Sequence, residues 1–162
     1  MSSLSATPPV PALRLAGLSK FFGSAVAVDR LDLDVRAGEF YARLGPNGAG
    51  KTTTLRMVAG LLPADAGEIS VFGVDARRDT IAAKRIMAWL PDEPMLYDKL
   101  TPLEYLEFVA GLWSVDPGEA QTRARELCEV LDLWKHRAER CEGFSRGMKQ
   151  KVALAGAIIH NP

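Results

Sequence analysis

Eight consecutive residues, Gly45 to Thr52, match the phosphate-binding pattern G-x-x-x-x-G-K-S/T. Glycines let successive backbone N–H groups turn inward and form a concave anion site. A helix that follows the loop adds the partial positive charge of its N-terminus. The Lys51 ammonium can reach the β- and γ-phosphates, and the Thr52 hydroxyl can bind Mg²⁺. The predicted nucleotide contacts in this loop are Gly45, Pro46, Asn47, Gly48, Ala49, Gly50, Lys51, Thr52 and Thr53.

The residues on either side of the loop fit this interpretation. Apolar and more polar side chains alternate over residues 40–44, which predicts a β-strand leading into the loop. Leu55, Val58 and Leu62 follow at helical spacing and predict a helix. The alternative is a glycine-rich surface turn, which would require strand, loop, Lys-Thr pair and helix to coincide by chance. We therefore predict that the chain binds a nucleoside triphosphate.

Composition favours one soluble globular domain. The 162 residues are 48% apolar and 25% charged, a balance typical of such a domain. Lys+Arg and Asp+Glu are equal at 20 each, so no overall field draws the chain to nucleic acid or to an anionic membrane. We predict no nucleic-acid partner. Because no apolar run approaches the roughly 20 residues that cross a bilayer, we expect a cytoplasmic location.

Two smaller features concern the cysteines and the first residues. Cys128 and Cys141 are too few for a disulfide framework or a zinc site. Cys128 lies on an apolar helical stripe and is predicted to be a buried free thiol. Residues 1–11 are rich in Ser and Pro, lack the features of a signal peptide, and are predicted to form a disordered tail.

Alternating apolar residues predict further strands at 12–18, 31–35 and 69–72, and a short apolar run predicts another at 87–90. Helices are expected from residue 101 onwards.

Three helix starts can be read from the sequence. Thr101 to Glu104 combines a capping box with proline at the first helical position. Asp116 before Pro117 is a second cap, and a last helix is expected to begin near Ser145. The predicted inner stripes of these helices are Leu103, Leu106, Ala110 and Trp113; Ala120, Ala124, Leu127 and Leu131; and Met148, Val152, Ala155 and Ile159.

A second motif lies at the start of the last helix. Residues 143–152, Gly-Phe-Ser-Arg-Gly-Met-Lys-Gln-Lys-Val, resemble the signature motif of the ABC ATPases, usually written L-S-G-G-Q. Read alone, this motif would be a helix cap and little more. The resemblance implies that Ser145 and the N–H of Gly147 face the γ-phosphate of ATP bound to a second subunit, with Arg146 and Met148 in the same signature site.

Two further segments are similar to parts of the same family. Phe22 occupies the position of an aromatic ring that stacks on adenine; the alternative is a core residue beside Phe21. Residues 89–97, Trp-Leu-Pro-Asp-Glu-Pro-Met-Leu-Tyr, resemble the Q-loop, which joins the nucleotide site to the membrane subunit; the alternative is a proline-rich loop. Asp92 stands where the family usually has glutamine, and the resemblance implies a carboxylate that approaches Mg²⁺ together with Thr52.

The resemblance, which covers almost the whole chain, implies an α/β fold. Its parts are a P-loop NTPase core with an antiparallel β subdomain and a helical insert, C-terminally incomplete. We expect the β subdomain and P-loop core over residues 12–98, the helical subdomain over 99–145 and the signature helix over 146–162.

The resemblance also implies a function. The chain looks like the ATP-binding subunit of an ABC transporter, of the bacterial ABC-2 exporter type, which binds Mg-ATP and, when complete, hydrolyses it to power membrane export. The implied partners are a membrane-spanning transporter subunit and a second ABC ATPase subunit in a head-to-tail dimer. Such a protein lies on the inner face of the cell membrane, attached through its membrane subunit.

The sequence departs from the family pattern in its motifs and at single residues. The family's Walker B strand ends in Asp-Glu, which orders Mg²⁺ and polarises water; neither this strand nor the switch histidine has a counterpart before Pro162. We therefore expect no catalytic residue in this chain, ATP binding without fast turnover, and marginal stability.

Arg43 lies in a strand expected to be buried on both faces, where it is costly unless it reaches a carboxylate or solvent. Arg146 replaces a signature glycine and either contacts phosphate or is an exposed first-turn arginine.

Three alternative functions are compatible with parts of the sequence. A non-hydrolysing, truncated ATP-binding module is the main alternative. Soluble ABC ATPases of translation or DNA repair generally carry paired cassettes or long coiled-coil insertions, and this sequence has neither. A small P-loop kinase would leave residues 144–148 without a role. No residue identifies a cargo, a direction of transport or a particular membrane partner.

Overall fold

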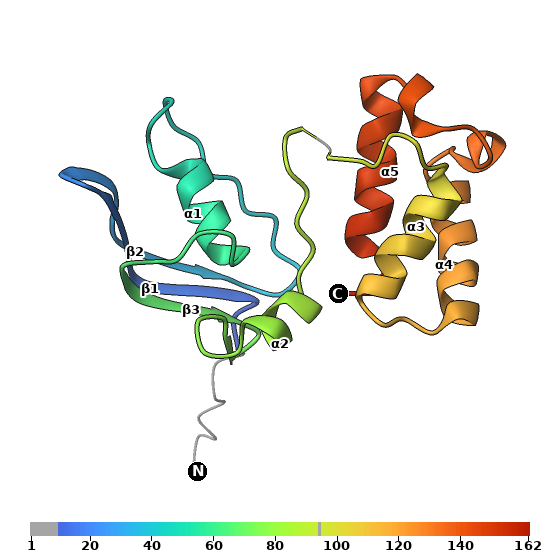
Figure 1. Ribbon diagram of the computed structural model, residues 1–162. Helices are drawn as coiled ribbons and strands as arrows, with labels where there is room; N and C mark the ends of the chain where they lie inside the picture. The colour runs from blue at the N-terminus through green and yellow to red at the C-terminus, as the bar shows by residue number, and fades with distance from the viewer. Residues whose placement is uncertain (1–9, 94) are drawn as a thin grey trace, which may run out of the picture. The chain divides into compact units, whose positions relative to one another are not determined.

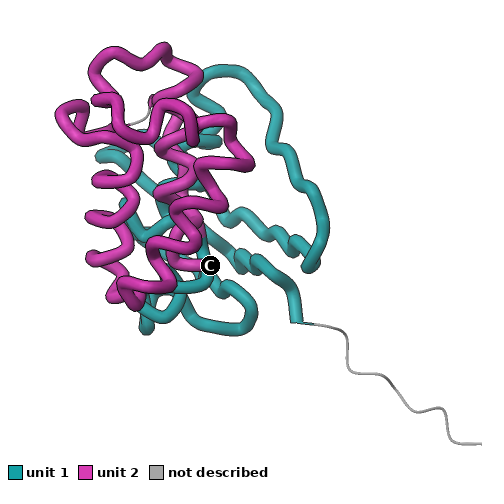
Figure 2. The backbone as a smooth tube through the Cα atoms, turned by 90° about the vertical axis from the view of Figure 1, so that its right-hand side faces the viewer, with its two compact units in different colours: residues 1–87 teal, residues 88–162 magenta. Residues whose placement is uncertain are grey.

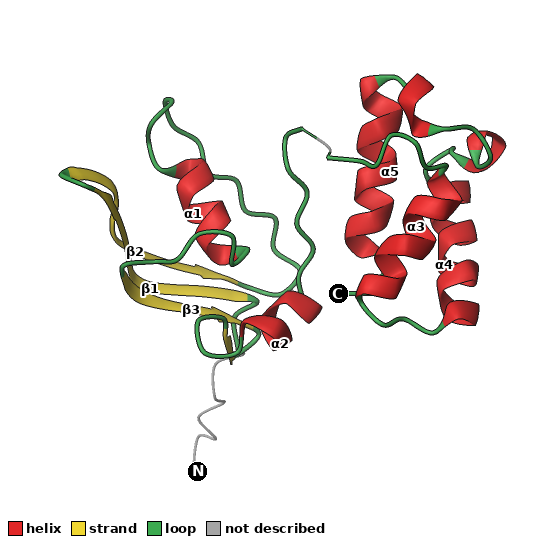
Figure 3. Ribbon diagram, in the orientation of Figure 1, coloured by secondary structure: helices red, strands yellow, loops and turns green. Residues whose placement is uncertain are grey.

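The computed structural model describes residues 10–93 and 95–162, in two compact units (Figure 2). Unit 1 comprises residues 1–87 and unit 2 residues 88–162. Strands lie in unit 1, whereas the described part of unit 2 contains helices and loops (Figure 3). The predicted tail lies outside the described residues, except for its last two.

Unit 1 is built on an antiparallel sheet with the strand order β2-β1-β3-β4. The predicted strands at 12–18, 31–35 and 69–72 are confirmed, and so is the antiparallel β subdomain. The bounds are Leu13–Phe22 for β1, Ala25–Val35 for β2, Ala66–Val71 for β3 and Val74–Asp75 for β4.

Helix α1, Lys51–Val58, lies over one face of this sheet (Figure 1). Burying apolar side chains between a helix and a sheet is the main favourable term in such packing. The helix predicted after the phosphate-binding loop is confirmed, and two of the three residues whose spacing predicted it, Val58 and Leu62, pack against the core of unit 1. Leu55 is 52% exposed, and the buried residues of α1 are Thr54 and Met57. The core of unit 1 consists of Leu15, Leu18, Val28, Met57 and Ile69.

Two predicted strands are absent. Residues 40–44 have no strand pairing, and Phe40 and Leu44 are 94% and 90% exposed. Residues 87–90 are likewise irregular. A strand exists only where a neighbour satisfies its N–H and C=O groups. No strand of the described residues pairs with either segment, so the alternation over 40–44 and the apolar run over 87–90 were both misleading.

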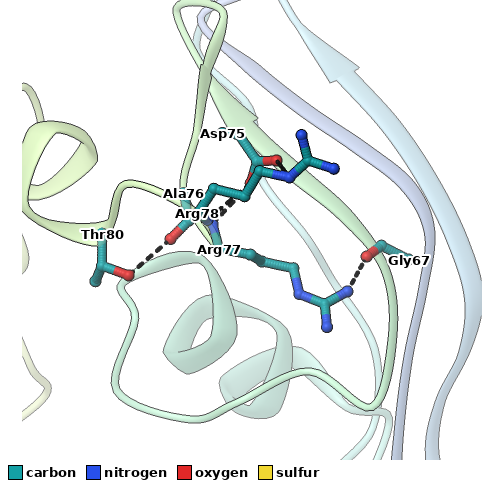
Figure 4. Close-up of polar contacts among 6 residues, drawn as sticks. All are labelled: Gly67, Asp75, Ala76, Arg77, Arg78 and Thr80. Carbon is teal, nitrogen blue, oxygen red and sulfur yellow. Dashed lines mark hydrogen bonds and ion pairs between the residues drawn. The ribbon is translucent and has the colours of Figure 1, made fainter.

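A polar network shapes the turn between β4 and helix α2, Thr80–Arg85 (Figure 4). The Asp75 carboxylate accepts hydrogen bonds from the backbone N–H groups of Arg77 and Arg78, at 2.9 and 3.1 Å. The Thr80 hydroxyl donates to a carbonyl four residues earlier, at 3.1 Å, and the Arg77 guanidinium donates to the Gly67 carbonyl. These bonds fix α2 against the start of β3.

Unit 2 is a helical bundle in which α3, α4 and α5 lie side by side (Figures 1 and 2). Its helices span Pro102–Leu112 for α3, Pro117–Val130 for α4 and Arg146–Ile158 for α5, with short 3₁₀ turns at Trp134–His136 and Cys141–Gly143. All three predicted helix starts are confirmed. The Thr101–Glu104 capping box forms in both directions, at 2.8 and 3.3 Å, and Asp116 accepts from two backbone N–H groups.

The three predicted inner stripes form one core. Its buried members include Leu106, Ala110, Ala120, Ala124, Val152, Ala155 and Ile159, with Leu103, Trp113, Leu127, Leu131 and Met148 packed against them. Cys128 is a buried free thiol, as predicted, and so is Cys141. Burial raises the pKa of the Cys128 thiol and, with the nearby Asp98 carboxylate, raises that of Cys141 to about 11. Both sulfurs therefore behave as small apolar groups at neutral pH.

Candidate functional site

The phosphate-binding loop depends on a glycine that no other residue can replace without strain. Gly50 has φ 71°, in the left-handed region that L side chains rarely adopt. A Cβ at this position would lie 2.3 Å from the carbonyl oxygen of Ala27 in β2. Gly48 also has a positive φ, of 86°, but has open space around it. The loop is thus held tightly against β2 at Gly50 and is open to solvent at Gly48.

The Lys51 ammonium lies at the mouth of the loop. Its Nζ donates hydrogen bonds to the carbonyl oxygens of Gly45, at 2.5 Å, and Pro46, at 2.7 Å. Helix α1 begins immediately after Gly50, and no side chain caps its N-terminus. The helix dipole, the backbone N–H groups and the ammonium together make this a positive site that suits phosphate groups.

The loop is supported from below by a chain of hydrogen bonds. Arg43 donates from one guanidinium nitrogen to Thr54 Oγ1, at 2.6 Å, and from the other to the Ala49 carbonyl, at 3.5 Å. Thr54, which is 4% exposed, in turn donates to the Gly50 carbonyl, at 2.8 Å. Arg43 therefore reaches a hydroxyl and a carbonyl rather than a carboxylate, and it is half-buried.

The supporting role of Thr54 is a feature that sequence reasoning missed. The signal was Arg43, a charged residue in an otherwise apolar segment, which requires a partner.

The side chains of Thr52 and Thr53 lie in the first turn of α1, exposed and half-buried respectively. Both threonines are placed beside the loop.

Phe22 lies in the same unit as the loop, at the end of β1. It is 53% exposed and its neighbour Phe21 is 44% exposed, so the alternative of a core residue is wrong. Phe22 pairs with Ala25 across the hairpin. The Gly50 contact at Ala27 lies two residues further along β2, or about 7 Å at the usual strand rise. The strand end that carries Phe22 and the phosphate-binding loop therefore meet β2 at nearby positions.

The signature segment forms the exposed start of α5. Ser145 is the N-cap residue, and its hydroxyl accepts a hydrogen bond from the Met148 backbone N–H at 3.3 Å. Ser145, Arg146 and Gly147 are exposed, and Met148 is half-buried. The interpretation of Arg146 as an exposed first-turn residue fits this placement.

The residues just after the segment that resembles the Q-loop are bonded to the residues just before α5. The Leu100 carbonyl accepts from the Cys141 backbone N–H, at 2.9 Å, and the Asp98 carbonyl accepts from that of Glu142, at 2.8 Å. Lys99 and Glu142 form an ion pair at 2.5 Å. The hydrogen bond between these two side chains raises the pKa of Lys99 and lowers that of Glu142.

A second ion pair connects this segment to α5 itself. Lys149 Nζ lies 2.9 Å from Asp98 Oδ2. Sequence reasoning did not find these contacts, because they join residues that are far apart in the chain. They fix residues 98–100 relative to the signature segment.

Asp92 is exposed and lies in unit 2, whereas Thr52 lies in unit 1. The pairing of Asp92 with Thr52 at a metal ion stays a prediction. Within residues 89–97, Pro94 lies outside the described residues. No helix in the described ranges, 10–93 and 95–162, has the length and apolar character needed to cross a membrane.

The loop, the uncapped helix and the surrounding sheet define a P-loop module. The family model described as "ABC transporter" matches residues 28–162. This match covers most of the sequence, and the chain belongs to the ABC transporter ATP-binding family. The resemblance seen in residues 143–152 is thereby confirmed at the level of the family.

Named relatives agree with this assignment. The chain is 36% identical over 150 residues to the linearmycin resistance ATP-binding protein LnrL of Bacillus subtilis, covering 93% of the chain and 48% of that protein. It is 36% identical over 156 residues to the daunorubicin/doxorubicin resistance ATP-binding protein DrrA of Streptomyces peucetius, covering 96% of the chain and 47% of that protein. The chain thus spans about half the length of these curated relatives.

Solved structures share the fold. An ATP-binding subunit of an ABC transporter superposes with a TM-score of 0.83 at 30% identity, covering 93% of this chain and 63% of the other. The cbiO1 structure from Clostridium perfringens superposes with a TM-score of 0.82 at 20% identity, covering 94% of this chain and 62% of that one, and supports the fold alone.

Proposed function

We propose that this chain binds Mg-ATP as the nucleotide-binding part of an ABC exporter. The observation that carries the proposal is the phosphate-binding loop, where the Lys51 ammonium stands at the mouth and the N-terminus of α1 is uncapped. When ATP binds, the ammonium exchanges two loop carbonyls for phosphate oxygens. Charge-assisted hydrogen bonds to phosphate are stronger than those to neutral carbonyls, so this exchange is favourable.

Other residues of unit 1 complete the proposed site. The Thr52 hydroxyl is a ligand for Mg²⁺, which neutralises charge on the phosphates when bound. The exposed Phe22 ring offers its surface to the adenine base. Asp92, from unit 2, is proposed as a further group that approaches the metal.

The proposed partners follow from exposed segments of unit 2. Ser145 and Gly147 are exposed at the start of α5, where backbone N–H groups favour an anion. We propose that Ser145, Arg146, Gly147 and Met148 face ATP bound to a second subunit in a head-to-tail dimer. A membrane-spanning subunit is proposed to contact the segment 89–97, which would hold the protein at the inner face of the cell membrane.

The transport role draws on the relatives, whose names describe resistance to linearmycin, daunorubicin and doxorubicin. We propose export of the bacterial ABC-2 type on this basis. For the 162-residue chain itself we propose ATP binding, since none of its described residues is assigned as the base that activates water. A non-hydrolysing ATP-binding module is the second candidate.

Two measurements on the same preparation test these proposals. Isothermal titration calorimetry with Mg-ATP should give saturable binding to one site per chain, and absence of binding would contradict the proposal. A phosphate-release assay at saturating Mg-ATP then separates the candidates. Release no faster than the uncatalysed background supports the non-hydrolysing module, and enzymatic release that is lost in Lys51→Met supports an active ATPase.

A further inference from the structure

We propose that Asp65 and Lys20 orient the Phe22 ring and thereby set the affinity of the site for the adenine base, separately from its affinity for phosphate. Asp65 precedes β3, and Lys20 lies two residues before Phe22 in β1. This inference rests on the proposed binding of ATP at the phosphate-binding loop. Both are positioning residues: Lys20 lies over the ring, and Asp65 acts through Lys20 and the Phe21 backbone.

Asp65 holds the end of β1 through three consecutive residues. Its backbone N–H donates to the Ser19 carbonyl at 3.0 Å. One carboxylate oxygen accepts from Lys20 Nζ at 3.0 Å, and the other accepts from the Phe21 backbone N–H at 2.7 Å. The Phe21 and Lys20 hydrogen bonds hold the pKa of Asp65 below its usual range. Both carboxylate oxygens are thus committed to the strand residues that lead to Phe22.

Lys20 is confined by its burial. Its side chain is 9% exposed, and Asp65 is the ion-pair partner of its ammonium, at 3.0 Å. A buried ammonium without a counter-charge is strongly unfavourable, so the carboxylate fixes where the ammonium lies. That position places Nζ over the Phe22 ring, 5.5 Å from its centroid, in a cation–π arrangement.

The ammonium occupies one face of a ring that is otherwise accessible. Phe22 is 53% exposed, so a planar group can still stack on the ring. The end of β1 that carries the ring also lies near the loop, because β2 contacts Gly50 at Ala27 and pairs with Phe22 at Ala25. A base and a triphosphate of one nucleotide can therefore meet the ring and the loop together. Fixing the ring in advance lowers the entropy that is lost when the base stacks.

This arrangement separates two parts of the binding energy. Asp65 and Lys20 act on the ring, whereas the phosphates meet Lys51 and the N-terminus of α1. Loss of Asp65 or Lys20 should therefore weaken binding of a ligand that carries a base. Binding of inorganic tripolyphosphate, which has none, should stay the same.

The test compares Mg-ATP with Mg-tripolyphosphate by calorimetry for the wild-type chain, Asp65→Asn, Lys20→Met and Phe22→Leu. We expect Asp65→Asn and Lys20→Met each to weaken ATP binding about threefold to tenfold, and Phe22→Leu about tenfold or more. Tripolyphosphate affinity should change by less than about twofold in all three. The double variant Lys20→Met/Phe22→Leu should bind ATP with the same affinity as Phe22→Leu alone, because Lys20 acts through the Phe22 ring.

Asp34→Asn is the matched control. Asp34 lies in the same sheet and forms an ion pair with Arg14 at 4.0 Å, but both side chains are about 60% exposed. This variant should leave both affinities unchanged. Circular dichroism confirms folding of each variant, and Lys20→Met carries the test if Asp65→Asn does not fold.

The outcomes distinguish the inference from the proposed function. A parallel loss of ATP and tripolyphosphate affinity would overturn the inference, because it would show a general structural role. Unchanged ATP affinity in Lys20→Met would overturn it as well. If the wild-type chain binds neither ligand, the proposed function fails and the inference fails with it.

Discussion

Replacing Gly50 with alanine should damage the phosphate-binding loop through two separable effects. The residue has φ 71°, and a side chain in this left-handed conformation costs about 1–2 kcal/mol. The new Cβ would also lie 2.3 Å from the Ala27 carbonyl oxygen, and backbone must move to relieve this overlap. Overpacking of this kind costs about 1–3 kcal/mol. The expected destabilisation of unit 1 is therefore about 2–5 kcal/mol, from the two effects together.

Gly48→Ala isolates the first effect. Gly48 has φ 86°, but a Cβ at this position would meet open space. Gly48→Ala should therefore lower the free energy of unfolding of unit 1 by only about 1–2 kcal/mol. The difference between the two variants measures the contact of the loop with β2.

The assay must report unit 1 specifically. The tryptophans, Trp89, Trp113 and Trp134, all lie in unit 2, and Trp113 and Trp134 pack on the helical core, so tryptophan fluorescence does not report unit 1. Hydrogen exchange of amides in residues 25–35, followed by mass spectrometry, reports β2 directly. Gly50→Ala should speed exchange there much more than Gly48→Ala, and should weaken Mg-ATP binding more. Equal exchange in the two variants would refute the close approach of the loop to β2.

Three further predictions concern other contacts. Arg43→Met removes the donor to Thr54 Oγ1 and should destabilise unit 1 by about 1 kcal/mol, seen as faster exchange in α1; no change would show that the support is not needed. Ser145→Ala removes the α5 cap and should cost about 1 kcal/mol in urea unfolding followed by tryptophan fluorescence, and an unchanged midpoint would contradict the capping bond. The pKa of the Cys141 thiol is raised to about 11, so this thiol should stay protonated and unmodified by a thiol reagent at pH 8. Its reaction should become faster as the pH rises towards 11 and should be complete in urea. Rapid labelling of the native protein at pH 8 would contradict the burial of Cys141.

Features encoded within a few residues could be predicted from the sequence. The capping box at Thr101–Glu104 and the caps at Asp116 and Ser145 involve neighbours in the chain, so their residue types suffice to locate three helix starts. The phosphate-binding loop is also encoded within a few residues, because one short pattern specifies both the turn and the helix that follows.

Features that depend on distant partners could not be predicted. Residues 40–44 alternate as a strand does, but pairing depends on a neighbour that the pattern does not name. The bonds of Asp65 to Lys20 and Phe21, and of Asp98 to Lys149, join segments about 45 and 51 positions apart. Polar residues make such contacts wherever the fold brings them together, and no local periodicity marks them.

The most direct test of the central claim is the dissociation constant of Mg-ATP for the wild-type chain and for Lys51→Met, measured by calorimetry with both proteins shown to be folded. Lys51 supplies the one ammonium that we place at the mouth of the loop. Loss of a charge-assisted contact of about 1.5–3 kcal/mol should weaken binding about 10- to 100-fold. Saturable binding by the wild type with this loss in the variant supports a nucleotide site built on Lys51. Equal affinities, or no binding by the wild-type chain, would contradict it.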